Sequence, residues 1–403
     1  MKWLLFAWKN VLRNRRRSLM ALLITAVGTA AALTGGGFAL FAYESLREVS
    51  ARDTGHVVLA QRNYFTGDED APMQFGLAGA EALAAELRSL PGVRAVVPRV
   101  QFSGLISNGD KSAVFIGAGV VPEVDFRLRG GQMNFIAGEA FDAGRSVPEI
   151  AIGSELARAM KAKPGTSLTL LATTTEASLN AVDVIVRGIV SVGVPDIDKR
   201  LVFADVAAVQ KLLLTDKVST LSVYLKDTGD TAAAAARIGA AHPELALRTW
   251  LDLAVFYQAV RALYNRIFGM LGGIMLVIVL FAVSNTLSMA VVERTREIGT
   301  LRAIGTLPGE IVGNFVLEGS LIGGAGALAG MLIAGAVNVA LIFAGLQMPP
   351  PPGRSGGYPM LVSFSVPLYA ATGLAVMVVA AIAAYIVSRK AARKPITEAL
   401  AHV

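Results

Sequence analysis

The chain of 403 residues is 54% hydrophobic and only 17% charged, which is too apolar for an ordinary soluble protein and makes an integral membrane protein the first class to consider. Its net charge of +7 could attract nucleic acid, but the Lys and Arg residues lie mostly beside long apolar runs, so we expect a membrane surface and no nucleic-acid partner. The absence of cysteine excludes a disulfide framework, a thiolate metal site and a cysteine nucleophile.

The chain opens on a basic segment, residues 1–17, which carries six Lys and Arg residues and no acid. Trp3 and Trp8 fall near one face of a helix, so we predict a cytoplasmic interfacial helix that lies along the inner leaflet. A cleaved signal peptide is the alternative, because a basic leader precedes an apolar run. The run is about twice as long as the apolar region of a signal peptide, which argues against cleavage.

Four apolar runs are long enough for helices that cross the hydrocarbon, which takes about 20 residues. We predict transmembrane helices at 18–43, 267–292, 311–346 and 366–388. Basic residues gather before the first helix, in the loop 293–310 and in the tail 389–403, whereas the loop 347–365 holds only Arg354. Basic segments stay in the cytoplasm, so we expect both termini to be cytoplasmic and residues 44–266 to be extracytoplasmic.

Residues 44–266 form a polar segment large enough for a domain. Short strands and helices alternate along it, and Asn108-Gly109-Asp110 predicts a tight hairpin turn. The expected strands are 55–60, 93–107, 112–120, 167–174, 180–190, 201–204, 221–225 and 245–249, and the expected helices are 78–90, 153–161, one from Asp205, and 231–241. We predict two α+β subdomains with antiparallel-rich sheets. The fold class is therefore a membrane α-helical protein of four transmembrane helices with an inserted α+β extracytoplasmic domain.

No pattern in the sequence indicates catalysis. His56, His242 and His402 lack metal-ligand spacing and are best interpreted as surface or satisfied histidines. There is no G-x-S-x-G elbow and no phosphate-binding G-x-x-x-x-G-K-[ST] loop. We expect no catalytic residue, no metal site, no cofactor bound by this chain and no enzymatic activity.

The membrane segments contain small residues at the spacing that lets helices approach closely. The glycines with this spacing are Gly269 and Gly273, Gly319 and Gly323, and Gly326 and Gly330. Asn285 and Asn338 are expected to form hydrogen bonds across helices. Glu318, one turn into the third helix, is expected at the level of the inner headgroups; the alternative is that it faces protein.

The loop between the second and third helices is amphipathic. Charged residues crowd its first turns, and Ile298, Leu301 and Ile304 follow at three-residue spacing, which predicts a short helix at the membrane face. Gly305 and Pro308 then break it before the third helix. The alternative interpretation is an ordinary solvated loop.

At this loop the sequence resembles a family. Glu293 to Gly305, E-R-T-R-E-I-G-T-L-R-A-I-G, is similar to the signature of the ABC transporter permeases of the MacB/FtsX-like superfamily. The further similar segments are the opening from Trp8 to Ser18, the stretch Ile152 to Ala157 leading to Lys163-Pro164-Gly165, and the closing Lys394 to Leu400. The length of the chain and the strand Gly55 to Leu59 resemble most closely the lipoprotein-releasing (LolC/LolE-type) permeases.

The resemblance implies a mechanism and partners. Such permeases pair, either as homodimers or with a related chain, and two copies of a cytoplasmic ABC ATPase, which binds ATP and Mg²⁺, dock on the inside loop. The residues that the resemblance assigns to this contact are Glu293, Arg294, Arg296, Glu297, Ile298, Leu301, Arg302 and Ile304. ATP hydrolysis then moves the periplasmic domain, which extrudes or releases a lipoprotein, lipid or other amphiphile from the outer leaflet of the bacterial inner membrane.

Two other functions stay open at this point. A signalling permease similar to FtsX would activate a periplasmic partner without transport, although such permeases typically have a much smaller outer domain. A membrane-anchored periplasmic binding or scaffold module would need no ATPase, which the inside loop disfavours.

Overall fold

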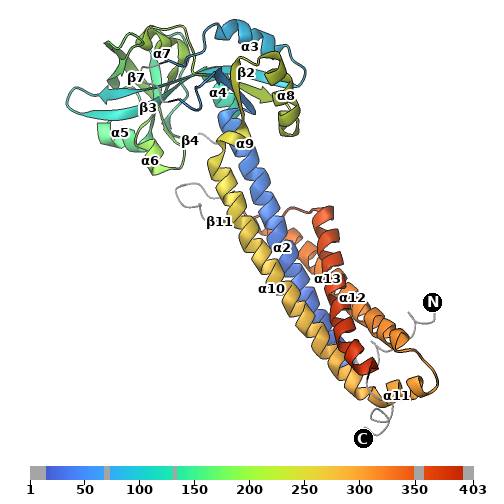
Figure 1. Ribbon diagram of the computed structural model, residues 1–403. Coiled ribbons are helices and arrows are strands. Elements are labelled where there is room, and N and C mark those ends of the chain that lie inside the picture. The colour runs from blue at the N-terminus through green and yellow to red at the C-terminus, as the bar shows by residue number, and fades with distance from the viewer. Residues whose placement is uncertain (1–14, 68–72, 130–133, 349–357, 394–403) are drawn as a thin grey trace. The chain divides into compact units, whose positions relative to one another are not determined.

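The computed structural model describes residues 15–67, 73–129, 134–348 and 358–393 (Figure 1). The interfacial helix predicted for residues 1–17 falls outside this range except for Arg15, Arg16 and Arg17, which belong to the first described helix. The chain divides into two compact units. Of the described residues, the membrane unit comprises 15–44, 260–348 and 359–393, and the outer unit comprises those between Ser45 and Ala259 together with Tyr358.

The helices and strands follow one another in this order: α2 (Arg15–Thr54), β1 (Val57–Gln61), α3 (Ala80–Arg88), β2 (Val93–Ser107), β3 (Ser112–Val120), α4 (Pro122–Arg129), β4 (Asn134–Gly138), β5 (Glu149–Gly153), α5 (Ser154–Met160), β6 (Ser167–Thr173), β7 (Leu179–Ser191), α6 (Pro195–Asp198), β8 (Leu201–Asp205), α7 (Val206–Leu213), β9 (Thr220–Leu225), η2 (Thr228–Asp230), α8 (Thr231–Ala241), β10 (Leu245–Thr249), α9 (Trp250–Leu253), α10 (Val255–Glu293), α11 (Thr295–Ala303), α12 (Pro308–Ala344), β11 (Gln347–Met348), β12 (Tyr358–Pro359) and α13 (Val366–Ala392).

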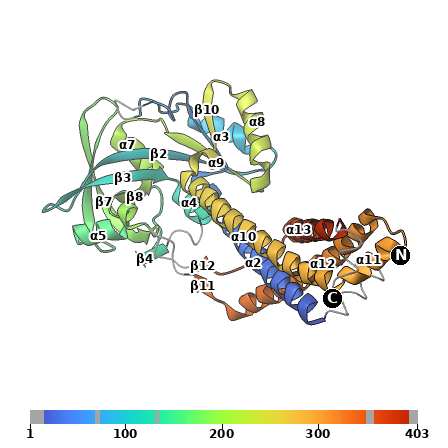
Figure 2. The ribbon, with the colours of Figure 1, turned by 60° about the horizontal axis from the view of Figure 1, so that its bottom comes forward.

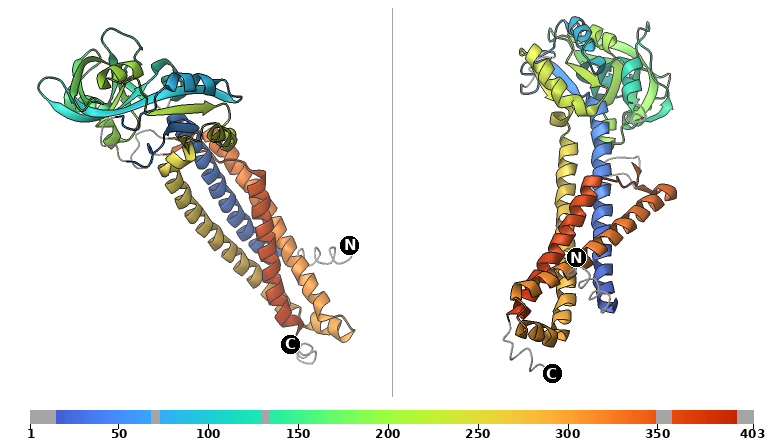
Figure 3. Two further views of the ribbon diagram at one scale, coloured as in Figure 1. Left: turned by 45° about the horizontal axis from the view of Figure 1, so that its top comes forward. Right: turned by 90° about the vertical axis from the view of Figure 1, so that its right-hand side faces the viewer.

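The membrane unit is a bundle of α2, α10, α12 and α13, which lie side by side in Figures 1 and 3. All four are long and apolar enough to cross a membrane. Their outward faces are as apolar as their core; Leu332 and Phe343, for example, are exposed. Hydrocarbon suits such a surface, and the prediction of four long apolar helices is confirmed.

Two of these helices extend beyond the predicted spans. The apolar run in α2 ends at Tyr43, but the helix continues to Thr54, and α10 begins at Val255, twelve residues before the predicted start at Ile267. Polar residues such as Glu, Gln and Arg favour helix as readily as most apolar ones do, so a change of hydropathy marks where a span ends and not where a helix ends.

Gly35, Gly36 and Gly37 lie in the middle of α2, where three glycines would weaken an isolated helix. Added Cβ atoms would meet the Phe268 ring at 3.0 Å, the Leu368 side chain at 3.2 Å and the Val362 side chain at 2.6 Å respectively. The Gly37 carbonyl also accepts a hydrogen bond from the Ser363 N–H at 3.0 Å. Neighbouring segments therefore surround α2 at its weakest point.

The outer unit contains one ten-stranded sheet with a branch. Its path runs β10-β1-β9-β2-β3-β8-β5-β7-β4, and β6 pairs with both β2 and β7. The first four strands are all antiparallel, in the order of a split βαβ fold, and α3 and α8 pack against them. The chain from β3 to β8 is an insertion between the two halves of this fold.

The remaining strands close on themselves. The path β2-β3-β8-β5-β7-β6 returns to β2 through the pairs Gly104–Ala172 to Ser107–Thr169, which makes a small six-stranded barrel. Figure 2 shows the long strands β2 and β3 that run along it. Leu168 and Leu170 alternate with half-buried or exposed residues on β6, as expected where one face fills a core. Closure removes the unpaired edges that an open sheet of these strands would leave.

The hairpin predicted at Asn108-Gly109-Asp110 connects β2 and β3. Gly109 has φ +91°, and the Asn108 Oδ1 atom accepts hydrogen bonds from the N–H groups of Asp110 and Lys111. An inserted α+β domain with mostly antiparallel strands is therefore confirmed. The division into two subdomains stays a prediction, because β2 runs through both parts and one continuous hydrophobic core spans them.

Candidate functional site

The inside loop folds as a helical corner between α10 and α12. Arg294, at φ −106° and ψ 13°, separates α10 from α11, and Gly305, at φ +104°, lets the chain turn after α11. The Thr295 hydroxyl donates to the carbonyls of Val291 and Val292, at 3.0 and 2.9 Å, which fixes the first residue of α11 to the last turn of α10. A short amphipathic helix was predicted here, and α11 is such a helix.

A buried ion pair joins this corner to the third membrane helix. The Arg294 Nη1 atom donates to the Glu318 Oε2 atom at 3.2 Å, and the two side chains are only 7% and 6% exposed. Two expectations are therefore wrong. Arg294 is not available for polar contact with a partner protein, and Glu318 faces protein instead of the headgroups, because a carboxylate among apolar helices is stabilised by an opposite charge.

The two faces of α11 differ. Ile298 is buried in a core with Val283, Leu287 and Ile311, so our expectation that Ile298 packs into a partner is also wrong. Leu301 is 36% exposed and Ile304 is 76% exposed, and Arg296 is exposed as well. Two further residues of α11 were predicted for partner contact: Glu297 is exposed and Arg302 is half-buried.

Glu293, the last residue of α10, forms an ion pair with Arg17 at the start of α2. Both side chains are well exposed, at 40% and 45%, so water weakens the attraction. The pair places Glu293, which was predicted to contact the partner, beside Arg17, the last residue of the basic segment 1–17.

The glycines of α12 form one stripe. Since each helical residue turns about 100°, Gly319, Gly323, Gly326 and Gly330 fall within about 60° of one another. Added Cβ atoms would lie 2.6 Å from the Ala384 Cβ and 2.5 Å from the Ala380 Cβ on α13 for the first two glycines. For the last two they would lie 2.7 Å from Thr25 and 2.6 Å from Thr29 on α2. The stripe therefore packs first on α13 and then on α2.

The other polar and small residues predicted to pack do not do so within the described chain. Added Cβ atoms at Gly269 and Gly273 on α10 meet nothing within 4 Å. Asn285 is exposed, and Asn338 has a buried Oδ1 atom with no hydrogen-bond partner among the described residues. The spacing of these residues along the helix did not determine which faces meet a neighbour.

In the outer unit, side chains from the sheet cap the end of α2. The Tyr224 hydroxyl donates to the Arg52 carbonyl at 3.1 Å, and the Ser222 hydroxyl donates to the Thr54 carbonyl at 2.7 Å. Between them, Arg99 donates to the Asp53 carbonyl at 2.6 Å and also binds the fully buried Asp125 carboxylate at 2.8 Å. The last carbonyls of a helix have no partner within the helix, so these bonds fix the last turn of α2, which belongs to the outer unit, to the sheet.

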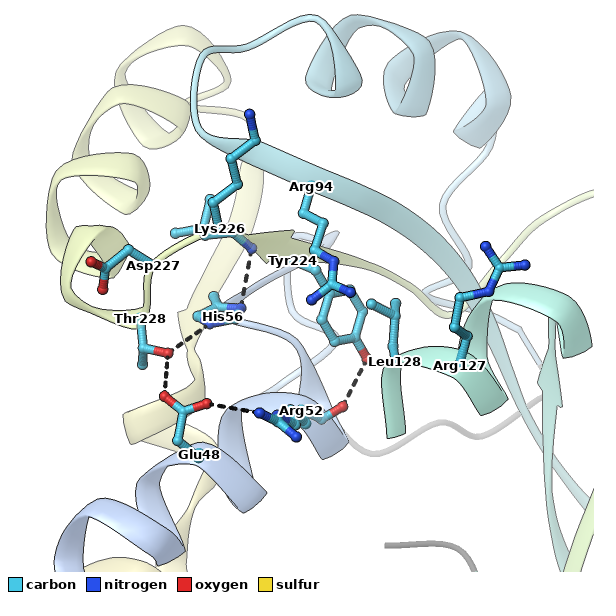
Figure 4. Close-up of a pocket in the computed structure, with 11 residues that line it drawn as sticks. Glu48, Arg52, His56, Arg94, Arg127, Leu128, Tyr224, Lys226, Asp227 and Thr228 are labelled. Carbon is cyan, nitrogen blue, oxygen red and sulfur yellow. Dashed lines mark hydrogen bonds and ion pairs between the residues drawn. The ribbon is translucent and has the colours of Figure 1, made fainter. Parts of the chain in front are cut away.

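A chain of hydrogen bonds through His56 lies beside this cap (Figure 4). The Leu225 N–H donates to the His56 Nδ1 atom at 3.2 Å, so the proton of the neutral ring lies on Nε2, which donates to the Thr228 hydroxyl at 3.0 Å. Thr228 in turn donates to Glu48 at 3.0 Å. Burial lowers the pKa of His56 below its ordinary 6.5, and the nearby Glu48 carboxylate opposes that shift.

These residues border a pocket of about 390 Å³ that is lined by Glu48, Arg52, His56, Arg94, Arg127, Leu128, Tyr224, Leu225, Lys226, Asp227 and Thr228. Within the described ranges, no three His, Asp or Glu side chains gather as a metal site would require.

Two family models match the chain. The model for the FtsX-like permease C-terminal region matches residues 269–396, and the model for the MacB-like periplasmic core domain matches residues 18–241, which is more than half of the chain. The chain belongs to the MacB/FtsX-like permease family. The predicted resemblance is confirmed, and most of the segment between the first two membrane helices lies within the match to the MacB-like periplasmic core domain.

Relatives of this MacB/FtsX-like permease include the lipoprotein-releasing system transmembrane protein LolC of Neisseria meningitidis serogroup B, which is 25% identical over 251 residues, or 60% of each chain. The ABC transporter permease YknZ of Bacillus subtilis is 30% identical over 115 residues, which are 28% of this chain and 26% of YknZ. The chain thus matches less than two thirds of the length of these relatives.

Two solved structures resemble the periplasmic domain of the permease. The periplasmic region of MacB from Actinobacillus actinomycetemcomitans is 13% identical at a TM-score of 0.35, covering 50% of this chain and 93% of its own. The extracellular domain of YknZ is 14% identical at a TM-score of 0.33, covering 48% of this chain and all of its own.

Sequence analysis missed the caps on α2 and the hydrogen bonds of His56. Arg99 and Asp125 lie 26 residues apart in the chain, and His56 and Thr228 lie 172 apart. The only sequence feature of His56 was its position at the start of a predicted strand, and a single histidine in a strand does not by itself indicate a functional site. Only the sheet order, which brings β1 beside β9, places these residues together.

Proposed function

We propose that this chain is the permease subunit of an ABC transporter in which a separate cytoplasmic ATPase docks on α11. ATP hydrolysis there moves the periplasmic domain, which releases or extrudes a lipoprotein, lipid or other amphiphile from the outer leaflet of the inner membrane. The observation that carries the proposal is the exposed face of α11. Arg296, Leu301 and Ile304 are exposed there, and apolar side chains beside a cation on a short helix suit a protein partner.

The ion pair between Arg294 and Glu318 supports the coupling step. It ties α11 to α12, and α12 packs through its glycine stripe on α13 and α2. A displacement of α11 by the ATPase is therefore passed to three membrane helices by close backbone contact. A ligand that binds two states of such an element with different affinity shifts its equilibrium.

The family supports the partners that we propose. Two ATPase copies carry ATP and Mg²⁺, and a second permease, either identical or related, completes the assembly. Lipoprotein is the proposed cargo because LolC, the relative matched over 60% of this chain, is named for a lipoprotein-releasing system.

The test is a pull-down of the tagged full-length chain from native membranes, with co-purifying proteins identified by mass spectrometry. Wild type is expected to recover an ABC ATPase, and Arg296→Glu and Ile304→Asp are expected to lose it at unchanged permease expression. Lys390→Glu, an equal charge reversal at an exposed position on α13, is the matched control and should keep the ATPase.

Three results would contradict the proposal. The ATPase contact is wrong if well-expressed wild type recovers no ATPase, or if both α11 variants retain it. Recovery of a cell-wall hydrolase in place of lipoprotein cargo would instead support the signalling function.

A further inference from the structure

The pocket beside the end of α2 is unusual in its charge. Four basic side chains border it, Arg52, Arg94, Arg127 and Lys226, against two carboxylates, Glu48 and Asp227. Its volume of about 390 Å³ is enough for a small organic group. The residues come from α2, β2, α4 and the end of β9, so the pocket depends on the folded sheet.

The acceptor groups of this pocket already have partners within the chain. Glu48 accepts from the Thr228 hydroxyl at 3.0 Å and lies 3.5 Å from Arg52 in an ion pair. Asp227 accepts from the Gly229 N–H at 2.7 Å. A bound cation, or a sugar hydroxyl that needs an acceptor, would compete with these partners for the two carboxylates.

The neutral donors that border the pocket are engaged too. The His56 Nε2–H is directed to Thr228, and the Tyr224 hydroxyl donates to the Arg52 carbonyl. The donors that remain are those of Arg94, Arg127 and Lys226, which form no ion pair with any carboxylate in the described ranges. A ligand of this pocket must therefore bring negatively charged acceptors.

Figure 4 shows how the three cations lie. Arg94 points toward Tyr224 in the middle of the pocket, whereas Lys226 and Arg127 stand at its edges with their charged ends directed outward. Long, exposed side chains at an edge can turn onto a ligand held in the middle. One planar guanidinium at the centre with two mobile cations around it suits a tetrahedral anion with several oxygens.

We propose that this pocket binds a phosphate group, carried either by the headgroup of an anionic phospholipid or by a free ion, with Arg94 as its central ligand and Arg127 and Lys226 at its edges. The lipid source is chemically reasonable because Glu48 and Arg52 follow Tyr43, the last residue of the apolar run of α2, by only five and nine positions. Headgroup phosphate is concentrated at the end of such a run. The site is separate from the ATPase contact on α11 and does not depend on it.

The experiment titrates two probes, inorganic phosphate and dihexanoyl phosphatidylglycerol, into the full-length chain purified in maltoside micelles and follows binding by calorimetry. The pocket variant replaces Arg94, Arg127 and Lys226 by Ala. The control variant replaces Lys163, Lys211 and Arg237 by Ala, which removes the same charge from exposed positions of the outer unit away from the pocket. A second pocket variant, Arg127→Ala with Lys226→Ala, keeps Arg94 in case the triple variant folds poorly.

We expect wild type and control to bind at least one probe, and the pocket variants to bind it about tenfold or more weakly, as expected for lost charge-assisted hydrogen bonds. Tighter binding of the phospholipid identifies a headgroup as the source, and equal binding of the two probes identifies free phosphate. The proposal is overturned if wild type binds neither probe, if the pocket variants bind as wild type does, or if the control loses as much affinity as they do.

Discussion

Arg294 and Glu318 carry the only described ion pair of the membrane unit in which both partners are buried. Removing two charges from water costs several kcal/mol each, and their attraction balances that cost only when hydrogen bonds complete the arrangement. The Arg294 Nη2 atom has no hydrogen-bond partner in the described part of the chain, so the arrangement is incomplete. The pair therefore serves to fix the position of α11 more than to add stability.

Removal of one partner should nevertheless be severe. Glu318→Gln leaves a buried guanidinium without a counter-charge, and we expect the unfolding free energy of the purified chain to fall by about 3 to 5 kcal/mol. Arg296→Gln, at an exposed position on α11, should change it by less than about 0.5 kcal/mol. Denaturant unfolding in micelles measures both free energies. Equal stability of the two variants would contradict the role given to the ion pair.

His56 predicts a dependence on pH. Its pKa is lowered in the folded chain, so the unfolded chain takes up the proton more readily, and the neutral ring contributes stability that is full above pH about 6.5 and is lost as the pH falls through the folded pKa. The unfolding temperature of the wild type should therefore fall more steeply than that of His56→Gln on acidification from pH about 7.5 to about 5. Parallel curves would show that His56 does not titrate in this way.

At the scale of elements, α12 organises the membrane unit. The helix that its glycine stripe contacts changes along its length: Gly319 and Gly323 contact α13, and Gly326 and Gly330 contact α2. Buried Ala380 and Ala384 face the stripe from α13, so small residues meet small residues. Close backbone approach of this kind replaces the hydrophobic effect, which does not drive association between helices in lipid.

Gly323→Leu should force α12 and α13 apart, because even a Cβ atom at this position lies 2.5 Å from the Ala380 Cβ. We expect a loss of about 1 to 3 kcal/mol, the usual range for overpacking. Gly335→Leu is the matched control on the same helix, where an added Cβ meets nothing within 4 Å. Unfolding temperatures in micelles compare the two, and an equal effect would mean that the contact with α13 is not tight.

For the whole molecule, local sequence patterns predicted most elements but not how they join. The bounds of β2, β3, α8 and β10 agree with those predicted, since alternation, turn residues and proline positions are local signals. β5 was missed because all five of its residues are buried, which removes the two-residue period. Closure of the barrel depends on β6 meeting β2 about 60 residues away, and no local pattern encodes that pairing.

The candidate site was predicted in the same partial way. Spacing along the loop located α11 and its apolar residues, but the resemblance to the family assigned Ile298 and Arg294 to a partner. Which side of a helix is covered depends on the crossing of α10 and α12, and Glu318 lies 24 residues beyond Arg294. Side-chain burial of this kind follows from tertiary packing and not from helical periodicity.

The orientation of the chain can be tested directly because it contains no cysteine. Glu176→Cys places a thiol on the exposed turn between β6 and β7, and Thr300→Cys places one on the exposed side of α11. A membrane-impermeant maleimide should label position 176 in intact spheroplasts and position 300 only after the membrane is permeabilised, since the basic loop is expected inside. The opposite labelling would reverse the topology.

The three glycines in the middle of α2 have a mechanical consequence. A helix with Gly35, Gly36 and Gly37 bends easily by itself, yet each glycine is held from outside, by Phe268, Leu368 and Val362. The bending stiffness of α2 is therefore a property of the bundle and not of the helix. Any rearrangement that moves one of these neighbours away allows α2 to bend at the glycines. Any rearrangement that restores the contact makes α2 stiff again.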